Sequence, residues 1–525
     1  GNILYVYGFS TVAIFLLVIS ILNYVNLTIS QVIARRKELL IKRTLGASRV
    51  NLGLQFFIES IAISLISVTL AYLIVFLAFS TDFLGHILQK TELQKLLLTP
   101  ITVVQLMILG ILVGIASAIY PAISLTSPSN HQEIQKNGSA GVFGISASEW
   151  MLLAQLSITV AIIACASLTS SQIQYLSSKP LGFTSDNRMV VELNGADNIE
   201  RIPLMKEQLL NNPNISNVTS AAYIPGTGNA ISILEAETGN GTSENINVAY
   251  LSVDQDYIES MDIKMLEGNF FSETRTPERP VIVNQTLVRQ MGWDTPLGKS
   301  IGRGTVIGVV EDFHYRSLNE DIQPMTIWLF SDNYSSLSPS QRMNLSRFLI
   351  ISFTPAITLN NETINEVRNS IQLFYPNTII EPMLLSQELS AQYQEEESLS
   401  FLVRTFSIVS IIISMAGLFG VTRYIATKRR KEIAIRRISG ASVIDIATLL
   451  SKKLIVVIAL ASVPTCLLSY FLTDIWLSRF AYRIDINLLY FMGSFGLIAF
   501  LTLALVLITA LSEMKSVTSK ILKYD

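Results

Sequence analysis

The chain has few charged residues, few cysteines and few histidines for its length. Only 15% of its 525 residues are charged, and its mean hydropathy is +0.46, which excludes a purely soluble globular protein. Cys165 and Cys466 each lie inside an apolar run, so a disulfide-stapled secreted scaffold is excluded. Of the three histidines, His86, His131 and His314, none lies within helical or hairpin spacing of another. We therefore predict no metal site and no cofactor.

The net charge of −2 is the sum of two opposite parts. Residues 171–400 hold 14 Lys/Arg and 28 Asp/Glu, a net charge of −14, whereas the rest of the chain holds 24 and 12, a net charge of +12. Such a separation is typical of a membrane protein whose loops differ between its two sides.

Seven apolar runs have the length of about 20 residues with which a helix crosses a bilayer. They cover residues 5–29, 54–80, 101–125, 150–169, 401–425, 453–473 and 488–511. Lys and Arg are enriched after the first, fifth and seventh runs, as in loops that stay in the cytoplasm. The chain is thus expected to begin outside and to end in the cytoplasm. Because it starts with Gly1 and has an odd number of spans, we also expect a further span before it.

The outer segment, residues 171–400, is large enough for its own hydrophobic core. Apolar or alternating runs predict strands, and apolar residues on one helical face predict amphipathic helices. The predicted strands include Met189–Leu193, Val281–Val283, Val306–Val310 and Phe348–Phe353, and the predicted helices are Ile202–Leu210 and Ile364–Tyr375. The fold class is a polytopic α-helical membrane protein with an α+β extracytoplasmic domain of one or two subdomains. Residues 171–180 and 385–400 are expected to continue the adjoining spans as helical stalks.

The most specific feature is an internal repeat at an offset of 394 residues. Residues 35–48, RRKELLIKRTLGAS, align without gaps to residues 429–442, RRKEIAIRRISGAS, with nine of fourteen positions identical. Each copy follows a span that enters the cytoplasm and precedes a span that leaves it. The chain therefore contains two related membrane halves.

Each copy predicts a basic helix, a Gly-Ala-Ser turn and a second helix with Ser48 or Ser442 as N-cap. The expected ion pairs are Glu38–Lys42 and Glu432–Arg436. Such a pair contributes only about 0.2 to 0.5 kcal/mol, so helix stability alone does not explain the repetition.

Two interpretations of the repeat stay open. The copies could be positive-inside anchors at the lipid headgroups, or they could form a docking surface for a cytoplasmic partner, presented once per half. Anchoring needs positive charge but not this order of residues, and the order therefore favours docking.

The pattern R-x-K-E-x-x-I-[KR]-R-x-x-G-A-S between two spans resembles the cytoplasmic coupling segment of FtsX-like permeases, the family that includes the macrolide exporter MacB. Motifs of the outer segment are similar, in order, to the periplasmic core domain of large Bacteroidetes-type permeases of that family. They are Leu181-Gly182-Phe183, Ile224-Pro225-Gly226, Gly292-Trp293, Pro296-Leu297-Gly298-Lys299 and Ile307 to His314. The resemblance covers essentially the whole chain.

The resemblance implies the permease subunit of an ATP-binding-cassette transporter, which is not itself an enzyme. A separate cytoplasmic ATPase dimer would hydrolyse ATP, and its motion would pass through the spans to the outer domain, a mode called mechanotransmission. The expected function is export or extraction of an amphipathic substrate, such as an antibiotic, peptide or lipoprotein, at a bacterial inner membrane. Membrane lipid is an expected partner, a periplasmic adaptor is a further candidate, and nucleic acid is not expected.

The implied ATPase-docking residues come from both copies of the repeat. They are Arg35, Arg36, Lys37, Glu38, Arg43, Gly46, Ala47 and Ser48 in the first copy, and Arg429, Arg430, Lys431, Glu432, Arg436, Arg437, Gly440, Ala441 and Ser442 in the second.

The resemblance also implies a division into domains. Residues 1–125 are the last three spans of the first FtsX-like repeat, with a coupling segment at 34–50; 126–149 are a cytoplasmic linker; 150–170 are the first span of the second repeat; 171–400 are a MacB-like periplasmic core domain with stalks; 401–512 are three spans of the second repeat, with a coupling segment at 428–444; and 513–525 are a cytoplasmic tail.

Two motifs suggest chemistry but are better explained as structure. Gly292–Ser300 looks like a phosphate-binding loop, yet five residues separate its glycines and Pro296 stiffens it. Glu311, Asp312 and His314 could suggest acid/base catalysis, but no nucleophile sits in a recognisable elbow, and we favour a structural role at a strand end.

Within the spans, we expect the charged residues to reach the membrane interface and the small residues to permit close helix packing. The charged residues are Glu59 and Arg404, and the small ones are Ala116, Ala118, Gly417 and Gly420. Two other function classes stay open: a signalling scaffold that activates a periplasmic hydrolase or sensor without transport, and a secondary carrier. The lack of a midplane carboxylate chain argues against the carrier.

Overall fold

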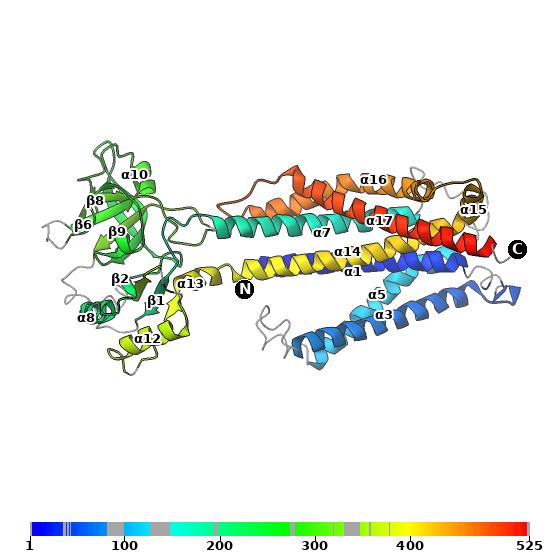
Figure 1. The fold of residues 1–525 in the computed structure, drawn as a ribbon, viewed down its shortest axis with the longest axis horizontal. Helices are drawn as coiled ribbons and strands as arrows, with labels where there is room; N and C mark the ends of the chain where they lie inside the picture. Colours follow the sequence, from blue (N-terminus) through cyan, green and yellow to red (C-terminus); the bar gives the residue numbers. More distant parts are fainter. Residues whose placement is uncertain are drawn as a thin grey trace. The chain divides into compact units, whose positions relative to one another are not determined.

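The structure is a computed structural model that describes residues 3–34, 38, 41–42, 44–80, 99–126, 147–193, 198–272, 279–318, 320–329, 347–355, 357, 359–376 and 378–521 (Figure 1). The chain forms two compact units. The membrane unit comprises residues 1–173, 396–477 and 484–525, and the outer unit comprises residues 174–395 and 478–483. The short segment 478–483 thus belongs to the outer unit, although its chain neighbours on both sides belong to the membrane unit.

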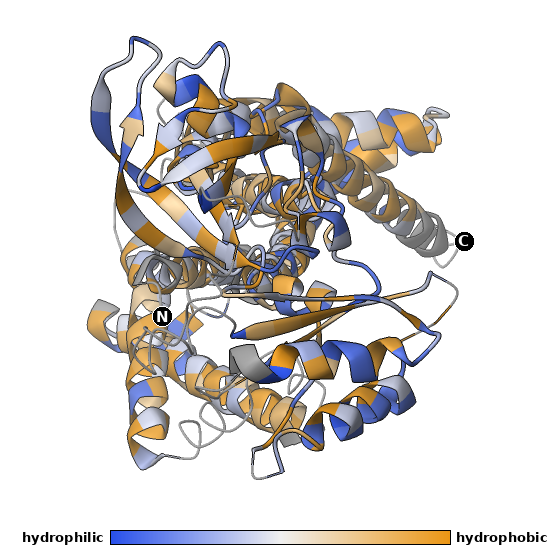
Figure 2. Ribbon diagram, turned by 90° about the vertical axis from the view of Figure 1, so that its left-hand side faces the viewer, coloured by the Kyte–Doolittle hydropathy of each residue, from blue (hydrophilic) through white to orange (hydrophobic). Residues whose placement is uncertain are grey.

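Seven of the described helices are long and apolar enough to cross a membrane. They are α1 (Ile3–Ala34), α3 (Arg49–Ser80), α5 (Pro100–Thr126), α7 (Ala147–Ser178), α14 (Gln394–Lys428), α16 (Val443–Leu477) and α17 (Leu488–Ile521). Each contains one of the seven predicted apolar runs, which confirms those predictions. These helices are coloured mostly as hydrophobic in Figure 2. Lipid offers no hydrogen bonds to an open backbone, so apolar segments of this length fold as helices.

The two predicted stalks differ in their continuity. α7 runs without interruption to Ser178, as expected for the first stalk. In the second, helix α13 (Leu385–Ala391) ends before α14 begins at Gln394, so the expectation of one continuous helix over 385–400 is wrong. Gln392 and Tyr393 separate the two helices.

Helices α3 and α5 pack closely because glycine removes the side chain at their contact. A Cβ atom on Gly114 would lie 2.7 Å from the Cα atom of Ile61, closer than real atoms approach. One turn earlier on α5, the carbonyl of Gly110 accepts a hydrogen bond of 2.7 Å from the Ser64 hydroxyl. Close approach of small residues is a common basis of helix association in membranes. Of the predicted small residues on α5, Ala118 is buried, whereas Ala116 is exposed, so the prediction is wrong for Ala116.

Helix α1 of the first half packs against α14 of the second half. The Asn23 side-chain amide donates a hydrogen bond of 3.2 Å to the carbonyl of Ile413. A Cβ atom on Gly417 would lie 2.6 Å from the side-chain oxygen of Asn23, and one on Gly420 would lie 2.3 Å from a methyl group of Leu27. The expectation that Gly417 and Gly420 permit close packing is confirmed. At the repeat offset of 394, Gly417 is the position equivalent to Asn23, so equivalent positions of the two halves meet at this contact.

The outer unit is built on a mixed sheet of eleven strands. They are β1 (Arg188–Glu192), β2 (Ile215–Ala221), β3 (Ala230–Glu237), β4 (Ser243–Val253), β5 (Met265–Gly268), β6 (Arg279–Asn284), β7 (Ser300–Ile301), β8 (Gly304–Val310), β9 (Met325–Leu329), β10 (Phe348–Phe353) and β11 (Met383–Leu384). The order is β11-β1-β10-β2-β4-β3-β7-β8-β6-β9, with β5 on β8. Because β4 also pairs with β9, the strands β4, β3, β7, β8, β6 and β9 close into a ring in that order. The four predicted strands lie in β1, β6, β8 and β10.

Two helices cover one face of the open part of the sheet, β11-β1-β10-β2. α8 (Asn198–Leu210) and α12 (Asn361–Gln372) contribute Met205 and Val367 to a core with Met189 and Leu349 of the sheet. These helices match the two predicted amphipathic helices. Neighbouring strand residues such as Val190 face the opposite side, into a second core that includes Phe313 and Tyr315. The alternation of strand side chains thus lets one sheet serve two cores.

We predict that Gly114→Val destabilises the chain, whereas Gly493→Val does not. A valine at 114 would clash with the α3 backbone, at a cost of about 1 to 3 kcal/mol for an overpacked site. A Cβ atom on Gly493, which lies on α17, would meet no atom within 4 Å, so this position controls for the change of residue type. Thermal unfolding of the two purified variants in detergent measures the difference. Equal melting temperatures would contradict the close packing of α3 on α5.

Candidate functional site

The second coupling segment forms a short helix, α15 (Arg430–Ile438), between α14 and α16. Its Ile433 is fully buried in a core shared with α16 and α17. The Arg436 guanidinium lies 2.9 Å from the Glu432 carboxylate, and in the first copy the Lys42 ammonium lies 2.9 Å from the Glu38 carboxylate. Both predicted ion pairs are confirmed. One face of α15 therefore packs into the core through Ile433, while Arg436 and Arg437 are exposed.

The turn after each coupling segment has the same geometry. Gly46 has φ +92° and Gly440 has φ +90°, the left-handed conformation that favours glycine. The Ala47 amide donates to the carbonyl of Lys42 (3.0 Å), and the Ala441 amide donates to the carbonyl of Arg436 (2.9 Å). Both turns are therefore glycine C-caps of the preceding helix.

Both predicted serine N-caps are confirmed. The Ser48 hydroxyl accepts a hydrogen bond of 3.2 Å from the Asn51 amide. The Ser442 hydroxyl accepts from the Asp445 amide (3.3 Å), and the Asp445 carboxylate accepts from the amide (2.8 Å) and the hydroxyl (2.7 Å) of Ser442. This reciprocal capping box lowers the pKa of Asp445 through its hydrogen bonds to Ser442, and the positive charge of Arg436 lowers it further.

Apolar side chains are exposed at equivalent positions of the two segments. Ile41 is 59% exposed and its equivalent Ile435 is 65% exposed; Val50 is 76% exposed and its equivalent Ile444 is 71% exposed. These residues are missing from the predicted docking set, which consists of charged and turn residues. The alignment of the repeats contains the signal, since both positions are β-branched and apolar in each copy.

The remaining predicted docking residues divide into two groups. Arg429, Arg430 and Lys431 lie at the start of α15. Arg35, Arg36, Lys37 and Arg43 lie outside the described residues.

The two charges predicted to reach the interface make contacts along and between helices. Glu59 accepts a hydrogen bond of 2.9 Å from Gln55, which in turn accepts one of 3.3 Å from Lys42. Polar contacts thus run from the first coupling segment along α3. Arg404, on α14, is exposed and donates a hydrogen bond to the Ser170 hydroxyl on α7.

Three of the motifs predicted from the sequence of the outer segment meet in one place. The His314 amide donates to the carbonyl of Leu181 (2.8 Å), and the amides of Gly226 and Gly228 donate to the carbonyl of Tyr315 (3.0 and 3.1 Å). A Cβ atom on Gly182 would lie 2.8 Å from the Cα atom of Phe313. We call the segments 181–183, 224–228 and 311–318 the junction. Within the outer unit, the junction lies next in sequence to the end of α7.

The start of α14 is tied to the same junction. The Leu318 amide donates a hydrogen bond of 2.9 Å to the hydroxyl of Tyr393, the residue that precedes α14. On α13, Leu389 fills the space beside Gly226, where a Cβ atom would lie 2.3 Å from its methyl carbon. Both chain connections between the outer domain and its neighbouring spans therefore contact segments 224–228 and 311–318.

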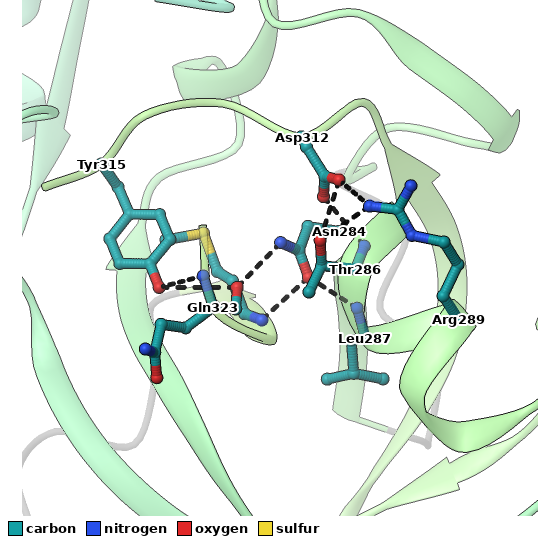
Figure 3. A network of polar contacts seen from close by, with 8 residues as sticks. Asn284, Thr286, Leu287, Arg289, Asp312, Tyr315 and Gln323 are labelled. Atoms are coloured by element: carbon teal, nitrogen blue, oxygen red, sulfur yellow. Dashed lines mark hydrogen bonds and ion pairs between the residues drawn. The ribbon is translucent and has the colours of Figure 1, made fainter. Parts of the chain in front are cut away.

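Polar contacts fix the junction to helix α10 (Gln285–Met291) and to Gln323, which precedes β9 (Figure 3). Asp312 accepts hydrogen bonds of 2.8 Å from both the amide and the hydroxyl of Thr286, and it forms an ion pair with Arg289. Asn284 caps α10 by accepting from the Leu287 amide (3.1 Å). Asp312 thus has the structural role at a strand end that its sequence context favours.

Tyr315 is joined to this network through Gln323 (Figure 3). Its hydroxyl lies 3.3 Å from the amide and 3.4 Å from the carbonyl of Gln323, and the same carbonyl accepts a hydrogen bond of 3.0 Å from the Asn284 side chain. Burial raises the pKa of Tyr315 to about 12, so its hydroxyl stays protonated and can act as a donor.

The loop whose sequence looks like a phosphate-binding motif has structural contacts. Gly292 caps α10 with φ +65°. The Trp293 indole donates to the carbonyl of Glu237, and the Lys299 ammonium lies 2.7 Å from the Glu237 carboxylate. The cation and the indole of this loop thus bind the end of β3.

Two family models match the chain. The model described as FtsX-like permease C-terminal matches residues 10–129 and 404–518, and the model described as MacB-like periplasmic core domain matches residues 151–372. No curated protein matches the chain.

Several solved structures are similar to the outer domain. The periplasmic region of MacB from Actinobacillus actinomycetemcomitans is 15% identical, with 40% of this chain and 94% of that chain covered and a TM-score of 0.28. A domain of a putative permease from Porphyromonas gingivalis is 16% identical, with 38% and 92% covered and a TM-score of 0.28. The extracellular domain of the noncanonic ABC-type transporter YknZ from Gram-positive bacteria is 14% identical, with 40% and 92% covered and a TM-score of 0.26.

The two family models occupy complementary parts of the chain. The first FtsX match contains most of α1 and all of α3 and α5, and the second contains most of α14, α16 and α17. The MacB-like match contains most of the eleven-stranded sheet between them. The chain therefore belongs to the FtsX-like permeases, as a multi-pass membrane protein that carries a MacB-like periplasmic core domain between two FtsX segments.

Proposed function

We propose that this permease is the membrane subunit of an ATP-binding-cassette transporter in a bacterial inner membrane. In this proposal a separate cytoplasmic ATPase dimer docks on the two coupling segments, and its ATP-driven motion reaches the outer domain through the membrane helices. The permease itself carries out no chemistry. The substrate class is an amphipathic molecule, such as an antibiotic, a peptide or a lipoprotein, that is moved at the outer face of the membrane.

The observation that carries the proposal is the equivalence of the two coupling segments. Both have an ion pair four residues apart, a glycine C-cap and a serine N-cap. Both also expose an apolar residue at equivalent positions, Ile41 with Ile435 and Val50 with Ile444. Two equivalent surfaces in one chain suit a partner that is itself a symmetric dimer, because each of its subunits then meets the same groups.

The exposed isoleucines favour protein docking over lipid anchoring. Anchoring at headgroups requires only positive charge near the membrane surface. A protein interface combines a buried apolar centre with a polar and charged rim. Ile435 and Ile438 are exposed on α15 beside the exposed Arg436 and Arg437, which is the composition expected of such an interface.

Transmission from the coupling segment is supported by its packing and its continuity with the long helices. Ile433 holds α15 in the core formed with Ile446 of α16 and Met514 of α17, so a push on α15 acts on both helices. α14, which precedes α15 by one residue, is a single helix from Gln394 to Lys428. Packed interiors have low compressibility, and a displacement at one end of such a helix is therefore carried along it.

We predict that the double variant Ile41→Glu, Ile435→Glu no longer binds the ATPase subunit. An apolar residue at the centre of an interface contributes about 2 kcal/mol to the binding free energy, so its loss lowers the affinity of each site roughly 30-fold. The measurement is co-purification of an ATP-binding-cassette ATPase with the permease from its native membranes, together with the ATPase activity of the reconstituted complex.

The matched control for this variant is Ile231→Glu, Ile233→Glu on β3 of the outer unit. These isoleucines are 63% and 70% exposed, close to the values for Ile41 and Ile435, but lie on the other side of the membrane in the proposed topology. The control should leave association intact. Normal association of the coupling-segment variant would contradict the proposed docking surface. ATPase stimulation without movement of any substrate would instead favour the signalling scaffold.

A charge-swap experiment separates docking from helix stability. We predict that Glu38→Arg with Glu432→Arg weakens association with the ATPase by roughly tenfold or more, since the two glutamate positions then present reversed charge to the partner. Adding Lys42→Glu and Arg436→Glu restores ion pairs of opposite orientation, and with them most of the helix stability of about 0.2 to 0.5 kcal/mol per pair. Full recovery of binding by the swapped variant would show that the pairs act only within the helix.

A further inference from the structure

The loop between the last two spans belongs to the outer unit. Residues 478–483 connect α16 to α17, yet they pack with residues 174–395. The loop contains Phe480 and Tyr482, but its sequence has no pattern that predicts which residues they contact. Its contact is made at the junction, on the same residues that receive the end of α7.

Tyr482 of this loop makes two aromatic contacts in the outer unit. The Lys179 ammonium lies 3.1 Å from the centroid of the Tyr482 ring, which places the cation over the ring face. The His314 ring meets the Tyr482 ring edge to face, with centroids 5.0 Å apart. A cation over an aromatic face and an edge-to-face ring pair are both attractive and directional, so the Tyr482 ring is held on two sides.

The two partners of Tyr482 are themselves fixed. Lys179 directly follows α7, and its ammonium also lies 5.8 Å from the centroid of the Tyr175 ring on that helix. His314 is 5% exposed, and its amide is bonded to the carbonyl of Leu181. Tyr482 therefore contacts two groups that are already part of the connection between α7 and the junction.

His314 is neutral in this contact. Burial and the positive charge of Lys179 lower its pKa to about 4, and the negative charge of Asp312 opposes this shift. A neutral imidazole packs against the Tyr482 ring without repelling the Lys179 cation beside it. The arrangement explains why the two groups share one aromatic ring.

We propose that Tyr482 is a positioning residue for coupling: it ties the α16–α17 loop to the junction, so that the second coupling segment acts on the outer domain through this loop as well as through α14. The inference rests on the proposed function. It follows from the chain path, because α15 leads directly into α16 and α16 leads into the loop. A push on α15 thus has a second route to His314 that does not pass through the outer sheet.

The test compares Tyr482→Leu with Tyr482→Phe in the full chain, reconstituted with its ATPase in lipid nanodiscs. Leucine removes the ring on which both contacts depend, whereas phenylalanine keeps the ring and removes only the hydroxyl. The readout is the change that ATP causes in hydrogen exchange of the backbone amides 311–318, of which the His314 amide bonds to Leu181 and the Leu318 amide to Tyr393. Co-purification with the ATPase and exchange in β10 report docking and folding separately.

We expect ATP to alter exchange at residues 311–318 in the unmodified complex and in Tyr482→Phe. In Tyr482→Leu the ATP effect should fall by about threefold to tenfold, which is the change that loss of a contact of cation–π strength produces. Association with the ATPase should stay unchanged. Lys179→Met should reduce the ATP effect to the same extent, and Lys179→Arg should not. These two variants test the same contact if Tyr482→Leu does not fold.

A normal ATP effect in both Tyr482→Leu and Lys179→Met would overturn the inference, as would the lack of any ATP effect in the unmodified complex. The proposed function fails in a different way. If Ile41→Glu with Ile435→Glu keeps both the association and the ATP effect, the docking surface is wrong whatever the result at Tyr482. Additive effects of Tyr482→Leu and Lys179→Met in the double variant would likewise show that the two residues do not act together.

Discussion

The bilayer constrains this chain more than any other factor, because a backbone in lipid must satisfy its own hydrogen bonds. Each of the seven long apolar runs is therefore helical, and the helices that contain them have between 27 and 35 residues. Regular helices leave little freedom for function within the spans. Besides contacts between spans, such as that of Asn23 with Ile413, specific contacts gather in the two coupling segments and in the junction. The proposed function assigns these two places to the input and the output of one motion.

Successive residues of segment 311–318 in the junction contact different parts of the outer unit. Asp312 binds Thr286 in the first turn of α10, Phe313 packs in the outer core, His314 meets the α16–α17 loop, and Tyr315 holds the 224–228 turn and Gln323. The Tyr315 amide donates to the carbonyl of Phe313 (3.1 Å), so the segment turns tightly after β8 and its successive side chains reach different elements. The Phe183 and Phe313 rings, with centroids 6.5 Å apart, add an aromatic contact between segments 181–183 and 311–318. A displacement of any one partner therefore acts on a segment to which the others are also bound.

The sequence predicts features that depend on local periodicity or on a repeated motif. The apolar runs, the Phe348–Phe353 strand, the serine N-caps and the ion pairs are of this kind, and all are confirmed. The meeting of Leu181, Gly226 and Tyr315 is not predictable in this way, because it joins segments that are far apart in the chain. The contact of Tyr482 with Lys179 has no local signal either. Lys179 precedes most of the outer domain in the sequence and Tyr482 follows it, so the two residues are far apart in the chain. The docking residues stay a prediction, now extended by the exposed isoleucines.

The contact between the two membrane halves links the two coupling segments as well. Asn23 on α1 meets Ile413 and Gly417 on α14, and Gly417 is the position equivalent to Asn23 in the repeat. A contact between equivalent positions is the signature of an isologous interface, in which two related units face each other across a two-fold axis. Here both units belong to one chain, so their association needs no encounter and does not depend on concentration. α1 leads into the first coupling segment and α14 into the second, and the close approach at Gly417 leaves little room for one helix to shift alone. A partner that moves both coupling segments together would therefore meet less resistance than one that moves either by itself, which gives a physical reason for the repeat to be present twice.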